Sequence, residues 1–202
     1  MSLNQPPHFT NTAFDVVAFA ASAGGVTALM KVLSGLPAKF PAAIVVVQHL
    51  DPHHRSLLVE ILSRRSPLHI KQAEEGDCLA PGTVYIAPPD RHVLVNSDGR
   101  LSLTQTELVH FVRPSADLLF ESTASSYKDR AIAVVLTGTG SDGAMGVTAI
   151  KQMGGTVLVE DEKTAEFNGM PRAAIQTACV DLILPLEGIP AALIKLCQGE
   201  SN

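Results

Sequence analysis

The chain has 202 residues, of which 46% are hydrophobic and 17% charged, and its formal net charge is −5. This length and composition are enough for one domain with a sizeable core and exclude disorder over most of the chain. The acidic balance, with a pI of about 5.8, lacks the basic excess typical of nucleic-acid-binding domains.

Cysteine use and the absence of targeting segments indicate the compartment. The cysteines Cys78, Cys179 and Cys197 are odd in number and widely spaced, so we expect no disulfide framework and a reducing environment. The N-terminal residues lack the positive region and the apolar run of a signal peptide. No apolar run approaches the roughly 20 residues that span a bilayer. We therefore expect a soluble, cytoplasmic protein without membrane insertion.

Short apolar runs alternate along the chain with stretches of helical spacing. The runs are rich in Val and Ile and apolar throughout, which is typical of strands buried on both faces of a parallel sheet. They cover residues 14–20, 42–47, 84–87, 131–136, 156–159 and 180–184. Helical spacing occurs at residues 26–36, 56–62, 116–124 and 143–153. This alternation predicts an α/β protein with three α/β/α layers, doubly wound around a mostly parallel sheet.

One segment departs from the alternation. Residues 92–95 and 100–103 alternate in polarity around Asn-Ser-Asp-Gly at 96–99, which predicts a β-hairpin added antiparallel at the sheet edge. Residues 1–13 and 198–202 are polar, and we expect them to form flexible tails. The remaining residues, 14–197, are predicted to form one domain.

The first loop after a predicted strand contains a candidate nucleophile. Residues 20–25 read AASAGG, and the small residues around Ser22 permit a sharp strand-to-helix turn. Such a turn can present the hydroxyl at a helix N-terminus, where free N–H groups stabilise an oxyanion. The pattern differs from the G-x-S-x-G elbow because Ala20 occupies the first glycine position. A simple helix cap is the alternative interpretation of Ser22.

The second loop supplies a candidate general base. His49 directly follows the apolar run 42–47 and Gln48, and a histidine at a strand's carboxyl end can serve as a base. Asp51, His53 and His54 follow it, but their spacing matches no regular zinc motif and no remote cluster completes a ligand shell. We therefore predict no metal site and no cofactor, and a solvated loop histidine stays the alternative.

The third loop, TGTGSDG at residues 137–143, permits two interpretations. Gly138, Gly140 and Gly143 fit G-x-G-x-x-G, with the acidic pair Glu160 and Asp161 about 20 residues further on. That combination imitates a dinucleotide-binding fingerprint and leaves open a nucleotide-binding, oxidoreductase-type domain. Against it, the carboxylate of Asp142 would repel the pyrophosphate, and a fold with two mononucleotide halves needs more chain than follows this loop.

The other interpretation combines the three loops. Ser22, His49 and Asp142 each follow a different buried strand, and the carboxyl ends of neighbouring parallel strands meet at one edge of a sheet. A hydroxyl, an imidazole and a carboxylate that converge there form a hydrolytic triad. The sequence therefore favours a serine hydrolase, and a catalytically inert receptor-binding module is a further alternative.

Five motifs in this order resemble the catalytic domain of chemotaxis protein-glutamate methylesterases (CheB type). They are ASAGG at 21–25, VVVQHL at 45–50, RPSAD at 113–117, LTGTGSDGAMG at 136–146 and AEFNGMPRAA at 165–174. The resemblance spans roughly residues 14–196. It implies a doubly wound α/β/α fold and hydrolysis of methyl esters on glutamate side chains of chemoreceptor signalling helices, with deamidation of receptor glutamines in many members.

The resemblance also assigns roles. Carried over by motif, Ser22 is the nucleophile, His49 the base and Asp142 the acid, and the backbone N–H groups of Ala23 and Thr139 form the oxyanion hole. The implied partner is the cytoplasmic domain of a methylated chemoreceptor or a similar ester-bearing protein. Only about 13 residues precede the first predicted strand, so we expect this chain to lack the receiver domain that family members usually carry.

Three arginines beside these motifs are candidate substrate contacts. Arg55 follows the histidine loop, Arg113 precedes the predicted helix at 116, and Arg172 follows Met170 and Pro171. A positive charge at these places can contact an acidic receptor helix. An ordinary surface charge is the alternative for Arg55. Arg113 belongs to a segment in which Ser115 is expected to cap the following helix.

Overall fold

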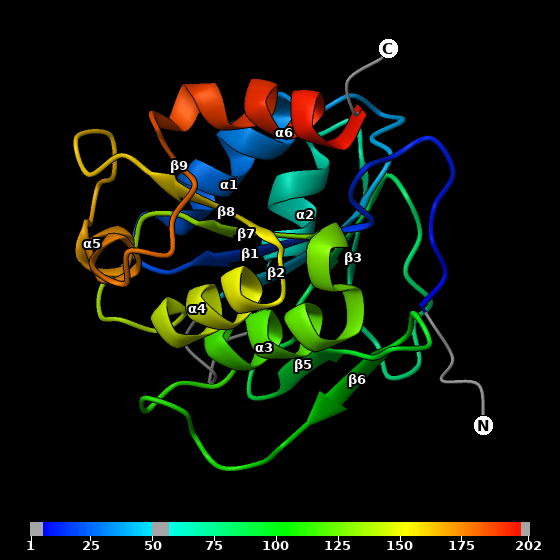
Figure 1. Ribbon diagram of the computed structural model, residues 1–202, viewed down its shortest axis with the longest axis horizontal. Coiled ribbons are helices and arrows are strands. Elements are labelled where there is room, and N and C mark those ends of the chain that lie inside the picture. The colour runs from blue at the N-terminus through cyan, green and yellow to red at the C-terminus, as the bar shows by residue number, and fades with distance from the viewer. Residues whose placement is uncertain (1–5, 50–56, 199–202) are drawn as a thin grey trace.

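The structure is a computed structural model, and it describes residues 6–49 and 57–198. Its main element is a seven-stranded sheet with the order β3-β4-β2-β1-β7-β8-β9 (Figure 1). Every neighbouring pair in this sheet runs parallel. The seven strands are β1 (Val16–Ala21), β2 (Ala43–Gln48), β3 (His69–Gln72), β4 (Thr83–Ile86), β7 (Ala131–Val135), β8 (Thr156–Glu160) and β9 (Leu182–Leu184).

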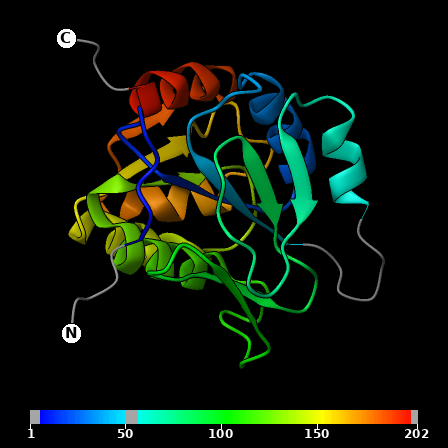
Figure 2. The ribbon, with the colours of Figure 1, turned by 90° about the vertical axis from the view of Figure 1, so that its right-hand side faces the viewer.

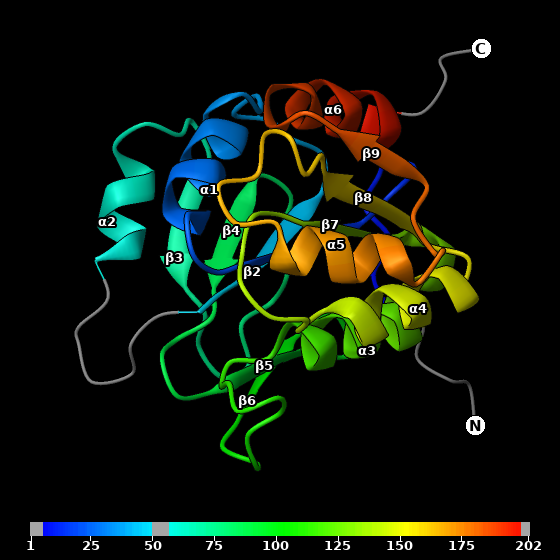
Figure 3. The ribbon, with the colours of Figure 1, turned by 90° about the vertical axis from the view of Figure 1, so that its left-hand side faces the viewer.

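Helices cover both faces of this sheet, which confirms the predicted three-layer architecture. Figure 3 shows α1 and α6 above the sheet and α3 and α4 below it. The α-helices are α1 (Gly25–Ser34), α2 (Leu58–Ser63), α3 (Ala116–Tyr127), α4 (Ala144–Gln152), α5 (Gly169–Gln176) and α6 (Ile189–Gln198). The described residues also form two short 3₁₀ helices, η1 (Lys128–Arg130) and η2 (Leu186–Gly188).

The central strand β1 shows why the runs are apolar throughout. All six of its residues are buried, and alternate side chains point to opposite faces. Val17 and Phe19 pack in the core formed with α1, α2 and α6. Val16 and Ala18 pack in the core formed with α3, α4 and α5. A strand between two helical layers has no solvent face, so its sequence has no polar alternation.

The predicted hairpin is present, but its expected place at the edge of the main sheet is wrong. Strands β5 (His92–Val95) and β6 (Leu101–Thr104) pair antiparallel as a separate two-stranded sheet. Val93, Val95 and Leu101 are buried in the same core as α3, so the hairpin forms an outer cover on that helix. Its apolar face is satisfied by a helix, and it therefore needs no strand neighbour.

The sequence analysis does not assign a strand to the edge strand β3. Figure 2 shows β3 at the edge of the sheet beside α2. Of its four residues only Ile70 is buried, while His69 and Gln72 are exposed. An edge strand needs one buried side chain and a row of backbone hydrogen bonds, neither of which produces a hydrophobic run.

Residues 6–13, assigned above to an N-terminal tail, hydrogen-bond to the body of the domain. Buried Asp15 accepts hydrogen bonds from the Phe9 N–H at 2.7 Å and from Arg130 Nη2 at 3.0 Å, and His8 Nδ1 lies 2.7 Å from its other oxygen. The Ala13 N–H donates to the Cys197 carbonyl at the end of α6. Within residues 6–49 and 57–198, no helix is long and apolar enough to cross a membrane.

Candidate active site

Ser22 and His49 follow the neighbouring central strands β1 and β2 at the carboxyl edge of the sheet. The last paired residues of these strands are Ala21 and Gln48, and the His49 N–H continues the ladder to the Ala21 carbonyl at 3.1 Å. Residues in register on adjacent parallel strands project to the same face, about 5 Å apart. The sheet therefore places the Ser22 and His49 backbones side by side.

Asp142 comes from the loop between β7 and α4 and contacts His49 directly. Its Oδ2 lies 2.9 Å from His49 Nε2, and both side chains are largely buried, with 4% and 14% exposed. Of the three predicted triad members, the structure thus joins the imidazole and the carboxylate. Within the described residues, the Ser22 hydroxyl makes no hydrogen bond to His49, and the complete triad stays a prediction.

The Asp142 carboxylate also lies at the amino end of α3. Oδ2 accepts the Ala116 N–H at 2.6 Å, and Oδ1 accepts the Asp117 N–H at 3.2 Å and the Ser115 hydroxyl at 2.8 Å. Free first-turn amides and the helix dipole favour a negative charge there. The sequence predicts that Ser115 caps α3. It does occupy the N-cap position, but its hydroxyl donates to Asp142 and accepts no amide of the helix, so the Asp142 carboxylate takes that role instead.

This setting keeps Asp142 ionised. Burial alone would raise the pKa of Asp142, but hydrogen bonds from His49, the Ala116 amide and Ser115 outweigh it and lower the pKa below 3.8. Burial raises the pKa of neighbouring Asp117, opposed by the Gly146 N–H and reinforced by the charge of Asp142. The pKa values of the two carboxyl groups are thus shifted in opposite directions, and the group with the lowered pKa faces His49.

The contact between Asp142 and His49 fixes the roles of the ring nitrogens. An ionised carboxylate accepts a hydrogen bond, so Nε2 carries the proton and Nδ1 is left with the lone pair. Nδ1 is then the nitrogen that can accept a proton from a serine hydroxyl. In the triad of chymotrypsin-like serine proteases the two ring nitrogens have the opposite assignment, but the chemistry is the same.

The glycines of loop 137–143 have a steric explanation without a dinucleotide. A Cβ at Gly138 would lie 2.3 Å from Met170 Sδ and 2.9 Å from Ser22 Cβ, so a side chain there would displace the candidate nucleophile. Gly140 and Gly143 have φ of 84° and 98°, which favour glycine. The motif spacing therefore reflects close packing against Ser22 and two left-handed turns.

In the dinucleotide alternative the acidic pair Glu160 and Asp161 would bind a ribose, but the Glu160 carboxylate is not accessible for this. Glu160 is 1% exposed, and its carboxylate accepts the Thr137 N–H at 2.8 Å. Glu160 is the last residue of β8, and its side chain is turned toward the glycine loop instead of the solvent. Burial raises the pKa of Glu160 above 4.5, opposed by the hydrogen bond from Thr137.

The role of the Ala23 and Thr139 N–H groups as oxyanion donors stays a prediction. Within the described part of the chain, the N–H groups of Ala23 and Thr139 donate to no protein acceptor. Both flank the candidate nucleophile: Ala23 follows it, and Thr139 follows Gly138, which packs against it. Two free amides beside a serine hydroxyl can stabilise a developing oxyanion.

A cavity of about 410 Å³ opens next to these groups. It is lined by Thr139, Gly140 and residues 165–169. The Glu166 carboxylate reaches from this lining toward the nucleophile loop, since a Cβ on Gly24 would lie 2.8 Å from its Oε2. Glu166 could not be selected from the sequence, because its position in the motif does not indicate which loop its side chain approaches.

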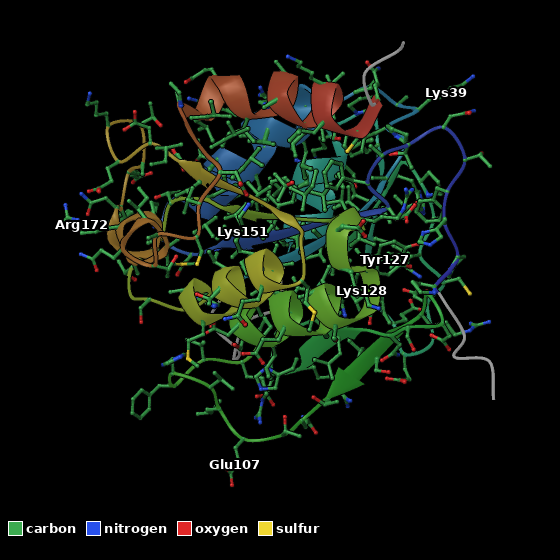
Figure 4. The ribbon with its side chains drawn as sticks, viewed as in Figure 1. Lys39, Glu107, Tyr127, Lys128, Lys151 and Arg172 are labelled. Atoms are coloured by element: carbon green, nitrogen blue, oxygen red, sulfur yellow. The ribbon has the colours of Figure 1, made fainter. Side chains whose placement is uncertain are left out.

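The candidate substrate arginines differ in their surroundings. Arg113 is engaged by two loops: Nη2 lies 2.5 Å from Oδ1 of Asp90, which lies between β4 and β5, and Nη1 donates to the Thr106 carbonyl of its own loop at 2.6 Å. Arg172 lies on the outer side of α5, half exposed and paired with Glu162 at 2.8 Å (Figure 4). Arg55 lies outside the described residues. A substrate contact stays a prediction for all three.

Metal ligands are not grouped in the described residues. Within 6–49 and 57–198, no cluster of three or more His, Cys, Asp or Glu side chains could hold a metal ion. Asp51, His53 and His54 lie outside those residues.

Comparison with known proteins identifies what the chain is similar to. The family model described as CheB methylesterase matches residues 17–193. A relative in Leptospira interrogans (strain Fiocruz L1-130) is 41% identical over 186 residues, which cover 92% of this chain and 96% of the relative. A Moorella thermoacetica protein named protein-glutamate methylesterase/protein-glutamine glutaminase is 40% identical over 189 residues, 92% of this chain but 45% of that protein.

A solved structure is similar throughout. The crystal structure of the Thermotoga maritima CheB methylesterase catalytic domain superimposes with a TM-score of 0.87 at 39% identity, covering 91% of this chain and 98% of that one. None of these comparisons supports a nucleotide-binding oxidoreductase. The burial of Glu160 and the position of Asp142 at the amino end of α3 are the physical reasons against that alternative.

Proposed function

Because this chain belongs to the CheB methylesterase family, we propose that it hydrolyses methyl esters on glutamate side chains of a chemoreceptor's cytoplasmic domain, with Ser22 as nucleophile. The observation that carries the proposal is the 2.9 Å contact between His49 Nε2 and Asp142 Oδ2 at the carboxyl edge of the sheet. It prepares a base beside the strand end from which Ser22 emerges. The relatives' names describe hydrolases, and the receptor substrate comes to this chain as part of the proposal.

The reaction proceeds through an acyl-enzyme. Ser22 Oγ attacks the ester carbonyl carbon while His49 Nδ1 takes the hydroxyl proton, and Asp142 stabilises the imidazolium. The bond to the methoxy oxygen then breaks, and His49 returns the proton so that methanol leaves. Water attacks the acyl-enzyme in the same way, which releases the glutamate carboxylate and restores the serine. On a receptor glutamine the same steps would release ammonia.

Backbone amides stabilise the intermediates of both steps. The Ala23 and Thr139 N–H groups are the donors for the carbonyl oxygen as it becomes negative. Ala23 directly precedes Gly24, the N-cap residue of α1, and the dipole of this helix adds to the stabilisation.

Replacement of the nucleophile tests the proposal. We expect Ser22→Ala to abolish methanol release from an in vitro methylated chemoreceptor cytoplasmic fragment and to prevent labelling by a serine-directed fluorophosphonate. The matched control is Ser125→Ala, since Ser125 is an exposed serine on α3 whose hydroxyl donates to the Ser122 carbonyl within the same helix. Methanol release by a folded Ser22→Ala protein at the wild-type rate would refute the assignment.

A further inference from the structure

Gln48 connects the nucleophile loop to the base loop. It is the last residue of β2 and is 4% exposed. Its Nε2 donates to the Ser22 carbonyl at 2.8 Å and to the His49 carbonyl at 2.9 Å. A single buried amide thus holds the main chain of both residues between which the proton is transferred in the proposed reaction.

The orientation of this amide is fixed by its surroundings. A flipped amide would direct Oε1 at two carbonyl oxygens, which accept and cannot donate. In the observed orientation Oε1 is buried and has no hydrogen-bond partner among the described residues. It packs against the start of α1 so closely that a Cβ on Gly25 would lie 2.0 Å from it.

An unpaired buried carbonyl is a cost to the fold. Such a group gives up its hydrogen bonds to water on folding and receives none in return, which destabilises the folded state. Gln48 therefore gains two hydrogen bonds and loses part of that gain at Oε1. A purely stabilising residue at a buried strand end would be apolar, like the other residues of β2.

Peptide planarity extends the effect of Gln48 to the oxyanion donor. The Ser22 carbonyl and the Ala23 N–H belong to one peptide unit, so they point in opposite directions. Gln48 Nε2 and the Gly25 N–H, each 2.8 Å from the Ser22 oxygen, hold that carbonyl. The same contacts direct the Ala23 N–H to the opposite side of the peptide unit.

We propose that Gln48 is a positioning residue that aims the Ala23 N–H at the oxyanion and holds the nucleophile and base loops in register. The inference rests on the proposed function, because it assumes that Ser22 is the nucleophile. It predicts that Gln48 matters for the transition state and hardly at all for substrate binding. Gln48 itself touches neither the substrate nor the reacting atoms.

Two variants of similar size test this role with p-nitrophenyl acetate as the substrate. Gln48→Met removes the donors and keeps the volume, and we expect kcat to fall about 10- to 100-fold, somewhat less than the loss of a whole oxyanion donor. We expect KM to change less than about twofold, and the melting temperature to stay close to that of the wild type because the unpaired Oε1 is removed as well. Affinity for a boronic acid, which mimics the tetrahedral state, should fall by the same factor as kcat/KM.

Gln48→Glu adds a pH signature. A carboxylate has no proton to donate and repels both carbonyl oxygens, whereas a protonated carboxyl can donate to one of them. We expect the activity of this variant, relative to wild type, to rise as pH falls. A residue that only filled space would show no such trend.

Gly25→Ala perturbs the same amide from the other side. Its Cβ would lie 2.0 Å from Gln48 Oε1 and 2.8 Å from Ala21 Cβ, so we expect a loss of kcat at least as large as that of Gln48→Met. Because part of this loss acts through the Gln48 amide, the loss in the double variant with Gln48→Met should be clearly less than the product of the two single losses. Independent, multiplying losses would overturn the proposal, as would a Gln48→Met variant with wild-type kcat. Ser22→Ala is measured beside them. If Ser22→Ala keeps its activity on p-nitrophenyl acetate, the proposed function fails. If Ser22→Ala is inactive but the Gln48 variants keep wild-type kcat, this inference alone fails.

Discussion

The Asp142 carboxylate serves two partners at once. It contacts His49 and accepts two first-turn amides of α3 together with the Ser115 hydroxyl. Its negative charge is held by groups that do not take part in the proposed proton transfer. The imidazole can therefore gain and lose a proton while its partner stays ionised and fixed in place.

This arrangement gives a prediction for Asp142→Asn. An amide can present its NH₂ group to Nε2, which would move the ring proton to Nδ1 and leave no base for Ser22. We expect kcat to fall about 10³- to 10⁴-fold, as loss of the orienting acid does in other triads. Methanol release and circular dichroism measured together check that the loss is catalytic.

Ser115→Ala is the matched control for that variant. It removes one hydrogen bond to the carboxylate but keeps the charge, so a loss of activity below about tenfold is expected. Equal losses in both variants would show that Asp142 acts only as a structural cap.

Single residues differ in how far they could be predicted from the sequence. Ser22, His49 and Asp142 each follow an apolar run, and the convergence of parallel strands suggests that they meet. The roles of Ser115, Gln48 and Glu160 could not be predicted, because they depend on which loop or strand end each side chain approaches. Glu160 shows this limit most clearly, because its carboxylate is buried in the fold although it belongs to an acidic run in the sequence.

At the scale of elements, the segment between β6 and α3 contains a strained turn. The segment projects from the body of the protein, as the position of Glu107 shows (Figure 4). Val109 and Val112 pair through two reciprocal backbone hydrogen bonds around His110 and Phe111, whose φ values are 50° and 65°. Two-residue turns with positive φ at both positions favour Asn-Gly, and Phe111 is 95% exposed.

We predict that Phe111→Gly stabilises the protein. Glycine adopts positive φ without a steric cost, and the exposed phenyl ring loses almost no buried contact, so the free energy of unfolding should rise by about 0.5–1 kcal/mol. The melting temperature should rise by about 1–4 °C. Phe111→Ala is the control, because it removes the ring but keeps a Cβ, and no increase is expected from it. An equal increase in both variants would attribute the effect to the ring instead of the backbone.

Strands of the main sheet with a hydrophobic run could be predicted, and the edge strand without one could not. The six runs correspond to β1, β2, β4, β7, β8 and β9. Strand β3 could not be predicted because its residues are mostly polar. The hairpin is recognised from its alternating polarity, but alternation does not reveal which element covers the apolar face, so its expected place in the fold is wrong. Its partner, α3, is set by packing between segments distant in sequence.

At the scale of the whole molecule, buried Asp15 ties the N-terminal segment to the sheet. Burial would raise the pKa of Asp15, but hydrogen bonds from Arg130, His8 and the Phe9 amide outweigh it and lower the pKa below 3.8. A lowered folded-state pKa contributes stability that is fully present above the unfolded value and is lost as pH falls through the folded value. The contribution is therefore complete at neutral pH, begins to fall near the unfolded value of about 3.9, and is lost at pH values below the lowered folded pKa.

Asp15→Asn should consequently lower stability at neutral pH. Breaking a buried ion pair leaves the Arg130 charge without its partner, and we expect a loss of about 3 kcal/mol at pH 7. Urea unfolding at pH 7 and at pH 3 should show that the difference from wild type shrinks in acid. Asp129→Asn, at an exposed position beside Arg130, is the control and should change stability by less than about 0.5 kcal/mol. A difference that stays constant with pH would mean that Asp15 contributes through packing alone.

The hydrogen bond from the Ala13 N–H to the Cys197 carbonyl holds the segment before β1 against the end of α6. Ala13 precedes β1, so this junction belongs to the amino edge of the parallel sheet, while Ser22 and His49 follow the carboxyl edge. This proximity makes the domain suited to circular permutation: a linker could join residue 13 to the end of α6, and new ends could open in the hairpin turn at 96–99 without changing the strand order.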